Sequence, residues 1–114
     1  MNEQLSIIIK SADDKKAFDI KVLEISKLTS IADFFVILSG NSQRQVMAIS
    51  DAIEEKMYLN GHDLRHKEGY NSGKWILLDY GDIIVHVFHK EDREFYNLER
   101  LWADAENIDI EIYN

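Results

Sequence analysis

Two carboxylates, Asp79 and Asp82, lie beside Gly81 in the segment 74–88, and their type and spacing suit chemistry better than any other pair in this chain. Paired carboxylates can act in acid–base catalysis or hold Mg²⁺. A catalytic site also needs convergent groups, such as a nucleophile or a phosphate-binding loop, and the neighbouring sequence offers neither. We therefore expect no catalytic residue. Two interpretations stay open: the acids are ordinary turn residues beside a glycine, or they meet a basic partner.

The four histidines raise the question of a metal site. His86 and His89 are three residues apart in an expected strand, so their side chains point to opposite faces. His62 and His66 have no cysteine and no third ligand at a suitable spacing. We therefore expect no metal.

The segment 74–88 is typical of two strands joined by a tight turn, in which Gly81 supplies the positive φ. If the loop is Tyr80 and Gly81, three pairs lie opposite each other on one face: Trp75 with His86, Leu77 with Ile84, and Asp79 with Asp82. The other face is purely aliphatic and is the expected core side: Ile76, Leu78, Ile83 and Val85. Directly opposed like charges are mildly destabilising, so we expect the first face to be covered by something basic.

The composition narrows the class of protein. The chain has 114 residues, of which 13 are basic and 21 acidic, giving a formal net charge of −8 and no cysteine. Phosphate backbones would repel such a chain unless its cations gathered on one face, and they are scattered, so we expect little direct nucleic-acid binding. No apolar run approaches the roughly 20 residues of a membrane helix, and the N-terminus lacks the basic region of a secretory signal. We expect no membrane association and a cytoplasmic protein.

The helices that must position these residues follow from the spacing of apolar side chains. One is expected over residues 2–14, although its three successive isoleucines also permit a strand. A second begins after Ser42, which forms a capping box with Gln45, and stops at Gly61. A third opens at Glu91 and presents three apolar side chains on one side: Phe95, Leu98 and Trp102, the last of which we expect in the core.

Strands are expected in the two arms of the hairpin and in three further stretches: 19–25, 33–39 and about 64–67. The run 33–39 is apolar throughout and is typical of a strand buried on both faces. The order of helix, two strands, helix, three strands and helix predicts one α+β domain, an α/β mixed sheet with helices packed on it. We place this domain at residues 1–104 and treat residues 105–114 as a C-terminal tail.

The same residues resemble the ribosomal silencing factor family (RsfS), also called the Iojap-like proteins. The resemblance is carried by the strings 31–37, 39–42 with 44–46, 68–69, 75–88, 93, 95–99 and 101–102. The combination of tryptophan, aspartate, glycine, aspartate and histidine within 75–88 is specific. The similarity runs from about residue 5 to residue 102, which is nearly the whole chain.

The resemblance implies a nucleotidyltransferase-like fold without its catalytic carboxylates. Gly40 and Ser42 resemble the glycine–serine signature of that fold, but no Asp-x-Asp or Asp-x-Glu follows in the next helix or strand. The resemblance also implies binding to the large ribosomal subunit through its fourteenth protein, which is basic and β-rich. Such binding sterically blocks association with the small subunit and represses translation. Roles in large-subunit biogenesis and homodimers of the free protein are further implications.

We therefore predict a docking face that binds this ribosomal protein sterically, without turnover and without a cofactor. Trp75, Leu77 and Ile84 supply apolar contact, and Asp79 and Asp82 pair with basic side chains of the partner. Glu68 and Tyr80 lie at the rim, and His86 completes the set. The docking face thus comprises Glu68, Trp75, Leu77, Asp79, Tyr80, Asp82, Ile84 and His86.

Two alternatives stay open. The first is a nucleotidyltransferase-like enzyme that uses Asp79 and Asp82 with Mg²⁺. The second is a homodimer that covers the same face, although a two-fold interface would bring further acids together.

Overall fold

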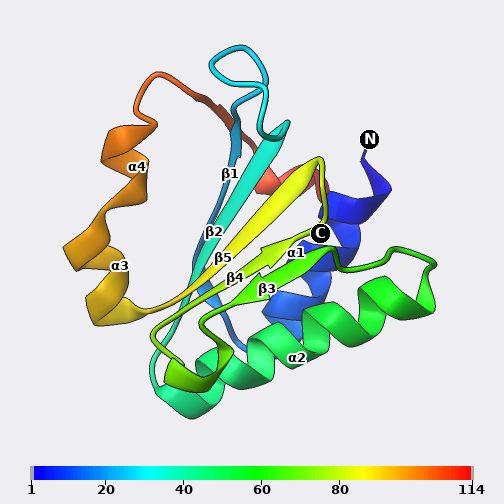
Figure 1. Cartoon of the computed structure of the whole chain (residues 1–114), viewed down its shortest axis with the longest axis vertical. Coiled ribbons are helices and arrows are strands. Elements are labelled where there is room, and N and C mark those ends of the chain that lie inside the picture. Colours follow the sequence, from blue (N-terminus) through cyan, green and yellow to red (C-terminus); the bar gives the residue numbers. More distant parts are fainter. Residues whose placement is uncertain (1, 114) are drawn as a thin grey trace.

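A computed structural model describes residues 2–113 and shows helices on both faces of one mixed sheet (Figure 1). The elements follow in the order α1 (Glu3–Asp14), β1 (Phe18–Glu24), β2 (Phe34–Gly40), α2 (Gln43–Leu59), β3 (His66–Glu68), the 3₁₀ turn η1 (Tyr70–Ser72), β4 (Trp75–Asp79), β5 (Ile83–His89), α3 (Lys90–Tyr96), α4 (Leu98–Leu101), β6 (Glu106–Ile108) and η2 (Ile110–Tyr113). The predicted α+β class is confirmed, and so is the predicted order as far as the third helix.

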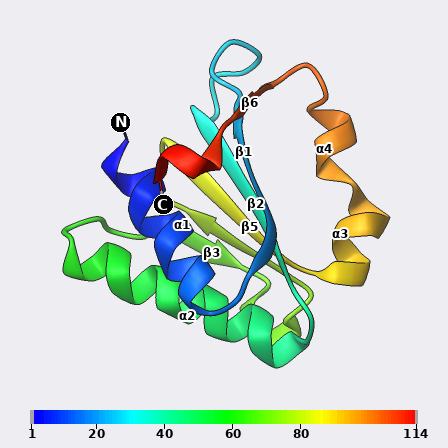
Figure 2. The ribbon, with the colours of Figure 1, turned by 180° about the vertical axis from the view of Figure 1, so that it is seen from behind.

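The sheet has the strand order β3-β4-β5-β2-β1-β6. Only the central pair, β2 with β5, is parallel, and the other pairs are antiparallel. A parallel pair needs a long crossover connection, and here that connection contains α2. Helices α1 and α2 lie against one face of the sheet, and α3 and α4 lie on the other (Figures 1 and 2).

The two long helices form where apolar periodicity and caps agree. In α1, Asn2 accepts a hydrogen bond from the backbone N–H of Leu5 at 3.2 Å, so the first turn is capped and the alternative of a strand is wrong. In α2, Ser42 accepts from the N–H of Gln45 at 3.0 Å, as the capping box predicts. After α2, Gly61 has a φ of +83°. Among residues 2–113, no helix is both long and apolar enough to span a bilayer.

The main core lies between the sheet and helices α1 and α2. It contains the aliphatic face of the hairpin, as predicted, together with one stripe from each helix: Leu5, Ile8, Ile9, Ala12, Val46, Ile49, Ile53, Met57, Ile76, Leu78, Ile83 and Val85. Strand β2 is buried on both faces because the second pair of helices covers its other side. This confirms the prediction made from its unbroken apolar run.

The predicted third helix is not continuous, because the structure divides it into two short helices. Asn97 has a φ of +46°, a left-handed conformation that ends a helix, so α3 stops at Tyr96 and α4 begins at Leu98. The break separates the three apolar side chains that one helical face was expected to share. Phe95 is 80% exposed, whereas Leu98 and Trp102 pack against the second core on this side of the sheet.

The segment 105–114, predicted as a tail, instead contributes to the sheet. Residues Glu106–Ile108 form β6, which pairs antiparallel with β1 and covers an edge that would otherwise expose unpaired backbone groups. Ala105 is buried, and Ile108 and Ile110 pack against the main core. The sequence did not reveal this role, because a strand of three residues is too short for its alternation to be recognised.

Candidate functional site

The β4–β5 hairpin forms as predicted, but its register differs by two residues. Tyr80 donates its N–H to the carbonyl of Ile83 at 2.9 Å, so the loop is Gly81–Asp82 rather than Tyr80–Gly81. Trp75 therefore pairs with Phe88, Leu77 with His86, and Asp79 with Ile84. The predicted opposition of Asp79 and Asp82 is wrong. A slip of two residues keeps each strand side chain on the face assigned to it.

The carboxylate of Asp79 explains the observed loop. It accepts the backbone N–H of Gly81 at 2.7 Å, and Gly81 has the positive φ of +90° that this turn requires. A side chain that bonds its own backbone two residues on is a turn device. The interpretation of Asp79 as a turn residue is therefore supported, while Asp82 stays exposed in the loop.

The structure places three of the predicted docking-face residues on one surface of the sheet and a fourth beside two of them. Trp75, Leu77 and Ile84 are half-buried on the face of the sheet that carries α3 and α4, and they leave part of each side chain accessible. Glu68 lines a shallow pocket with Trp75 and Leu77, and Asp82 is exposed at the tip of the hairpin. This arrangement combines apolar surface with carboxylates at its border.

Tyr80 and His86 lie in the interior instead. Tyr80, expected at the rim, is 7% exposed and belongs to the core on the opposite face, because it shares the two-residue alternation of Ile76 and Leu78. That alternation was visible in the sequence and could have placed it. His86 is 4% exposed and lies edge-on to the ring of Phe35 at 4.7 Å.

Three neighbouring side chains contact the indole of Trp75 and fix its position. Its ring stacks on Phe88 at 4.9 Å between centroids and contacts Tyr96 at 4.8 Å. Its indole N–H donates to Nδ1 of His86 at 3.1 Å. An aromatic side chain fixed before binding loses less conformational freedom when a partner covers it. Tyr96 was not predicted as a site residue, and its contact with Trp75 adds it to the site.

His86 must be neutral to accept the indole hydrogen bond at Nδ1. Burial lowers the pKa of His86 from 6.5 to about 4. Between these two values the unfolded chain binds a proton that the folded chain does not. His86 therefore lowers the free energy of unfolding progressively as the pH drops from 6.5 toward 4.

We expect the wild-type protein to lose about 2 kcal/mol more stability between pH 7 and pH 5 than a His86→Gln variant. Glutamine offers an acceptor for the indole N–H but does not titrate, so all other groups contribute equally to both proteins. Urea unfolding at the two pH values measures the difference. Equal losses in the two proteins would contradict a neutral, buried imidazole.

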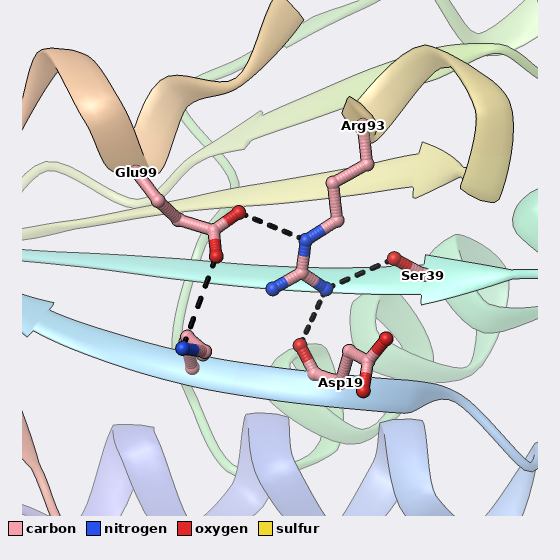
Figure 3. A network of polar contacts seen from close by, with 5 residues as sticks. Asp19, Ser39, Arg93 and Glu99 are labelled. Carbon is pink, nitrogen blue, oxygen red and sulfur yellow. Dashed lines mark hydrogen bonds and ion pairs between the residues drawn. The ribbon is translucent and has the colours of Figure 1, made fainter. Parts of the chain in front are cut away.

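Arg93 is a functional candidate that local spacing did not reveal. Its Nε donates to Glu99 at 3.0 Å, and one terminal nitrogen donates to the hydroxyl of Ser39 at 2.9 Å and to the carbonyl of Asp19 (Figure 3). Lys21 approaches the other oxygen of Glu99 at 4.0 Å. Arg93 is buried, and these contacts tie α3 and α4 to strands β1 and β2. Tyr96, which lies beside Trp75, belongs to the same helix α3 as Arg93.

The bulge in β1 provides one of these acceptors. The pairing of β1 with β2 shifts between Phe18 and Lys21, and Asp19 there has a φ of +51°. A bulge leaves backbone groups outside the ladder. Arg93 satisfies the carbonyl of Asp19, a partner 74 residues away in the sequence.

Gly69 supports Trp75 through a close backbone approach. Gly69 has a φ of +78°, and a Cβ there would lie 2.1 Å from the carbonyl oxygen of Trp75. Gly61 has a similar φ of +83°, but a Cβ there would meet nothing within 4 Å. The two positions therefore differ mainly in the steric contact.

We expect Gly69→Ala to destabilise the protein by at least about 1 kcal/mol more than Gly61→Ala, which carries only the left-handed penalty of about 1–2 kcal/mol. Chemical unfolding of both variants measures this difference. Equal effects would show that Gly69 can accept a side chain without displacing Trp75.

The arrangement offers little to a metal or to acid–base chemistry. Asp79 accepts the backbone N–H of Gly81 within the turn, and the ladder pairs Asp79 with Ile84 rather than with Asp82. Within residues 2–113, no three His, Asp or Glu side chains gather in a way that could hold an ion.

Known proteins resemble this chain over almost its whole length. A family described as "Ribosomal silencing factor during starvation" matches residues 1–114. A ribosomal silencing factor of Halalkalibacterium halodurans is 42% identical over 96% of this chain and 93% of its own, and one of Bacillus subtilis is 42% identical over 97% and 96%. The chloroplastic Iojap protein of Zea mays is 38% identical over 90% of this chain and 45% of its own length.

Solved structures agree with the fold. A crystal structure of a protein from Chromobacterium violaceum has a TM-score of 0.87 at 37% identity and covers 90% of this chain and 88% of its own. A crystal structure from Bacillus halodurans has a TM-score of 0.84 at 38% identity and covers 94% and 97%.

Proposed function

Because this chain belongs to the ribosomal silencing factor family, we propose that it binds the large ribosomal subunit and blocks association with the small subunit. The contact on the subunit is its basic, β-rich fourteenth protein, as the sequence resemblance implies. Occupying that surface represses translation by steric exclusion, so neither turnover nor a cofactor is required. A contribution to large-subunit assembly is compatible with the same contact, and we expect the protein to act in the cytoplasm.

The observation that carries this proposal is the partly exposed apolar surface of Trp75, Leu77 and Ile84. Tryptophan is enriched among residues that dominate the energy of protein interfaces, especially where it is rigid and central. Trp75 is held by Phe88, Tyr96 and the hydrogen bond to His86, so it is preorganised for such a role. An interface of standard size, about 1,600 Å² in total, suits one face of a domain this small.

The charge of the chain supports a basic partner. The net charge is −8, Glu68 lies beside Trp75 and Leu77, and Asp82 is exposed at the tip of the hairpin. Acidic side chains at the rim of an interface steer a cationic partner and raise the association rate, an effect that salt screens. Asp79 contributes to this field but stays engaged with the turn.

Sedimentation with separated ribosomal subunits tests the proposal. We expect the protein to migrate with the large subunit and not with the small one, and to reduce the formation of whole ribosomes when it is added before the subunits are mixed. Association should weaken as ionic strength rises. Unimpaired subunit joining at a saturating amount of bound protein would contradict steric exclusion.

The enzymatic alternative has little geometric support. Asp79 bonds the backbone of its own turn and pairs across the ladder with Ile84, so it does not form a site with Asp82. The relatives named above are called silencing factors and Iojap. Incubation with labelled ATP or CTP and Mg²⁺ separates the alternatives, because a steric factor should transfer nothing.

We also propose that the free protein forms dimers, as the resemblance implies. Phe95, Tyr96 and Leu101 are exposed apolar side chains on α3 and α4, and Tyr96 contacts Trp75. A dimer that used this surface would compete with the large subunit. Light scattering of the free protein, with and without large subunits, tests that competition.

A further inference from the structure

A small polar pocket shares no residue with the half-buried apolar surface of Trp75, Leu77 and Ile84. Six residues line it: Gln4 of α1, Gly61, His62, Asp63 and Arg65 from the connection between α2 and β3, and Tyr80 at the end of β4. Its volume is about 290 Å³. Because Tyr80 belongs to the core beneath α1 and α2, the pocket opens on the opposite side of the sheet from Trp75.

Two polar atoms of this pocket are buried without a partner. The hydroxyl of Tyr80 and Nε2 of His62 have no hydrogen bond to any group within residues 2–113. A polar group withdrawn from water without a hydrogen bond is costly, so such groups in native proteins call for an explanation. The two belong to segments that are far apart in the sequence, yet they line the same hollow.

The pocket is rich in hydrogen-bond donors. Burial, with a smaller effect from Glu54, raises the pKa of Tyr80, so its hydroxyl keeps its proton and can donate. Arg65 carries only donors, and its guanidinium lies over the hairpin turn, where a Cβ at Gly81 would come within 2.7 Å of its Cζ. Nε2 of His62 donates in the tautomer that places its hydrogen there.

Carboxylates near the pocket moderate its charge, and Glu54, which acts on Tyr80, is one of them. Asp63 lines it and is exposed, and Glu3 comes within 4.0 Å of His62 from a largely exposed position. A cation has no set of three ligands here among the described residues. The buried, unpartnered groups and the guanidinium favour a hydrogen-bond acceptor as the ligand. The nearby acids lower the affinity of the pocket for an anion.

We propose that this pocket binds a small oxyanion, the phosphate or carboxylate group of a small molecule. The oxyanion accepts from the hydroxyl of Tyr80, from Nε2 of His62 and from the guanidinium of Arg65. This inference does not rest on the proposed ribosomal function, because it can be tested with the isolated protein in the absence of ribosomal subunits.

Amide chemical shifts of the ¹⁵N-labelled protein test the proposal. Sodium phosphate and sodium acetate are titrated separately at constant pH, with sodium chloride keeping the ionic strength constant. We expect saturable shifts at His62, Arg65 and Gly81 with a dissociation constant on the order of 1–10 mM, as befits a few hydrogen bonds in an open pocket. Saturation by phosphate alone assigns a phosphate group, by acetate alone a carboxylate, and by both a general oxyanion site.

Two variants locate the site, and a third is their control. Tyr80→Phe removes only the unpartnered hydroxyl and Arg65→Gln removes the charge, and each should weaken binding at least about fivefold, the loss of one hydrogen bond. Lys10→Gln makes the same charge change at an exposed position of α1 and should bind like the wild type. No saturable shift, or shifts that persist unchanged in both pocket variants, would overturn the assignment.

Discussion

Trp75→Ala is expected to weaken binding to the large ribosomal subunit by about 5- to 30-fold or more, equal to about 1–2 kcal/mol. The indole supplies the largest apolar side chain on the proposed contact, and it is held in place by Phe88, Tyr96 and His86. Truncation removes both its area and the ordering of its neighbours. Sedimentation with large subunits at a fixed salt concentration measures the loss.

Two further variants separate contact from folding. Leu59→Ala shortens an apolar side chain that is 65% exposed at the end of α2, away from the docking face, and should leave binding unchanged. Trp75→Phe keeps an aromatic ring on Phe88 but removes the hydrogen bond to His86, so it should retain more binding than the alanine variant. Undiminished binding by folded Trp75→Ala protein, checked by circular dichroism, would exclude this face as the contact.

Arg93→Met is expected to destabilise the protein by about 2–4 kcal/mol. Methionine fills similar space but leaves the buried hydroxyl of Ser39 and the carbonyl of Asp19 without their donor. Removing one member of a buried ion pair strands the other, although Glu99 is partly exposed and its penalty is correspondingly smaller. Chemical unfolding measures the change.

Lys21→Met is the matched control for this cluster. Lys21 approaches the same Glu99 at 4.0 Å, but it is half exposed, and pairs of this kind contribute at most about 1 kcal/mol. Since Arg93 holds α3 and α4 against β1 and β2, its loss should also release Tyr96 from Trp75. Equal stability changes in the two variants would mean that Arg93 does not anchor these helices.

The burial of the Arg93 cluster shows why part of the site escaped prediction. Arg93 contacts Ser39 and Asp19, which lie 54 and 74 residues away in the sequence. Asp19 presents its carbonyl only because β1 bulges there. No periodicity within a short window reports such contacts, because they depend on how distant segments are brought together.

The hairpin shows where local reasoning succeeds and where it stops. Alternation assigned Ile76, Leu78, Ile83 and Val85 to the core, and all four are buried there. It could not choose between the loops Tyr80–Gly81 and Gly81–Asp82, because the two registers differ by two residues and give the same faces. The hydrogen bond from the backbone N–H of Gly81 to the carboxylate of Asp79 favours the observed loop. In that loop's register, Asp79 pairs with Ile84 rather than with Asp82.

From the sequence alone followed the α+β class, the second long helix with its caps, the inner face of the hairpin and the family resemblance, while the first helix was expected with a strand as its alternative. These are properties of local periodicity and of short strings of residues. The folded structure was needed to show that His86 is interior, that Asn97 divides the last helix, and that residues 106–108 close the edge of the sheet. The physical reason is that burial and strand pairing depend on contacts between distant segments, which a pattern of neighbouring residues does not contain.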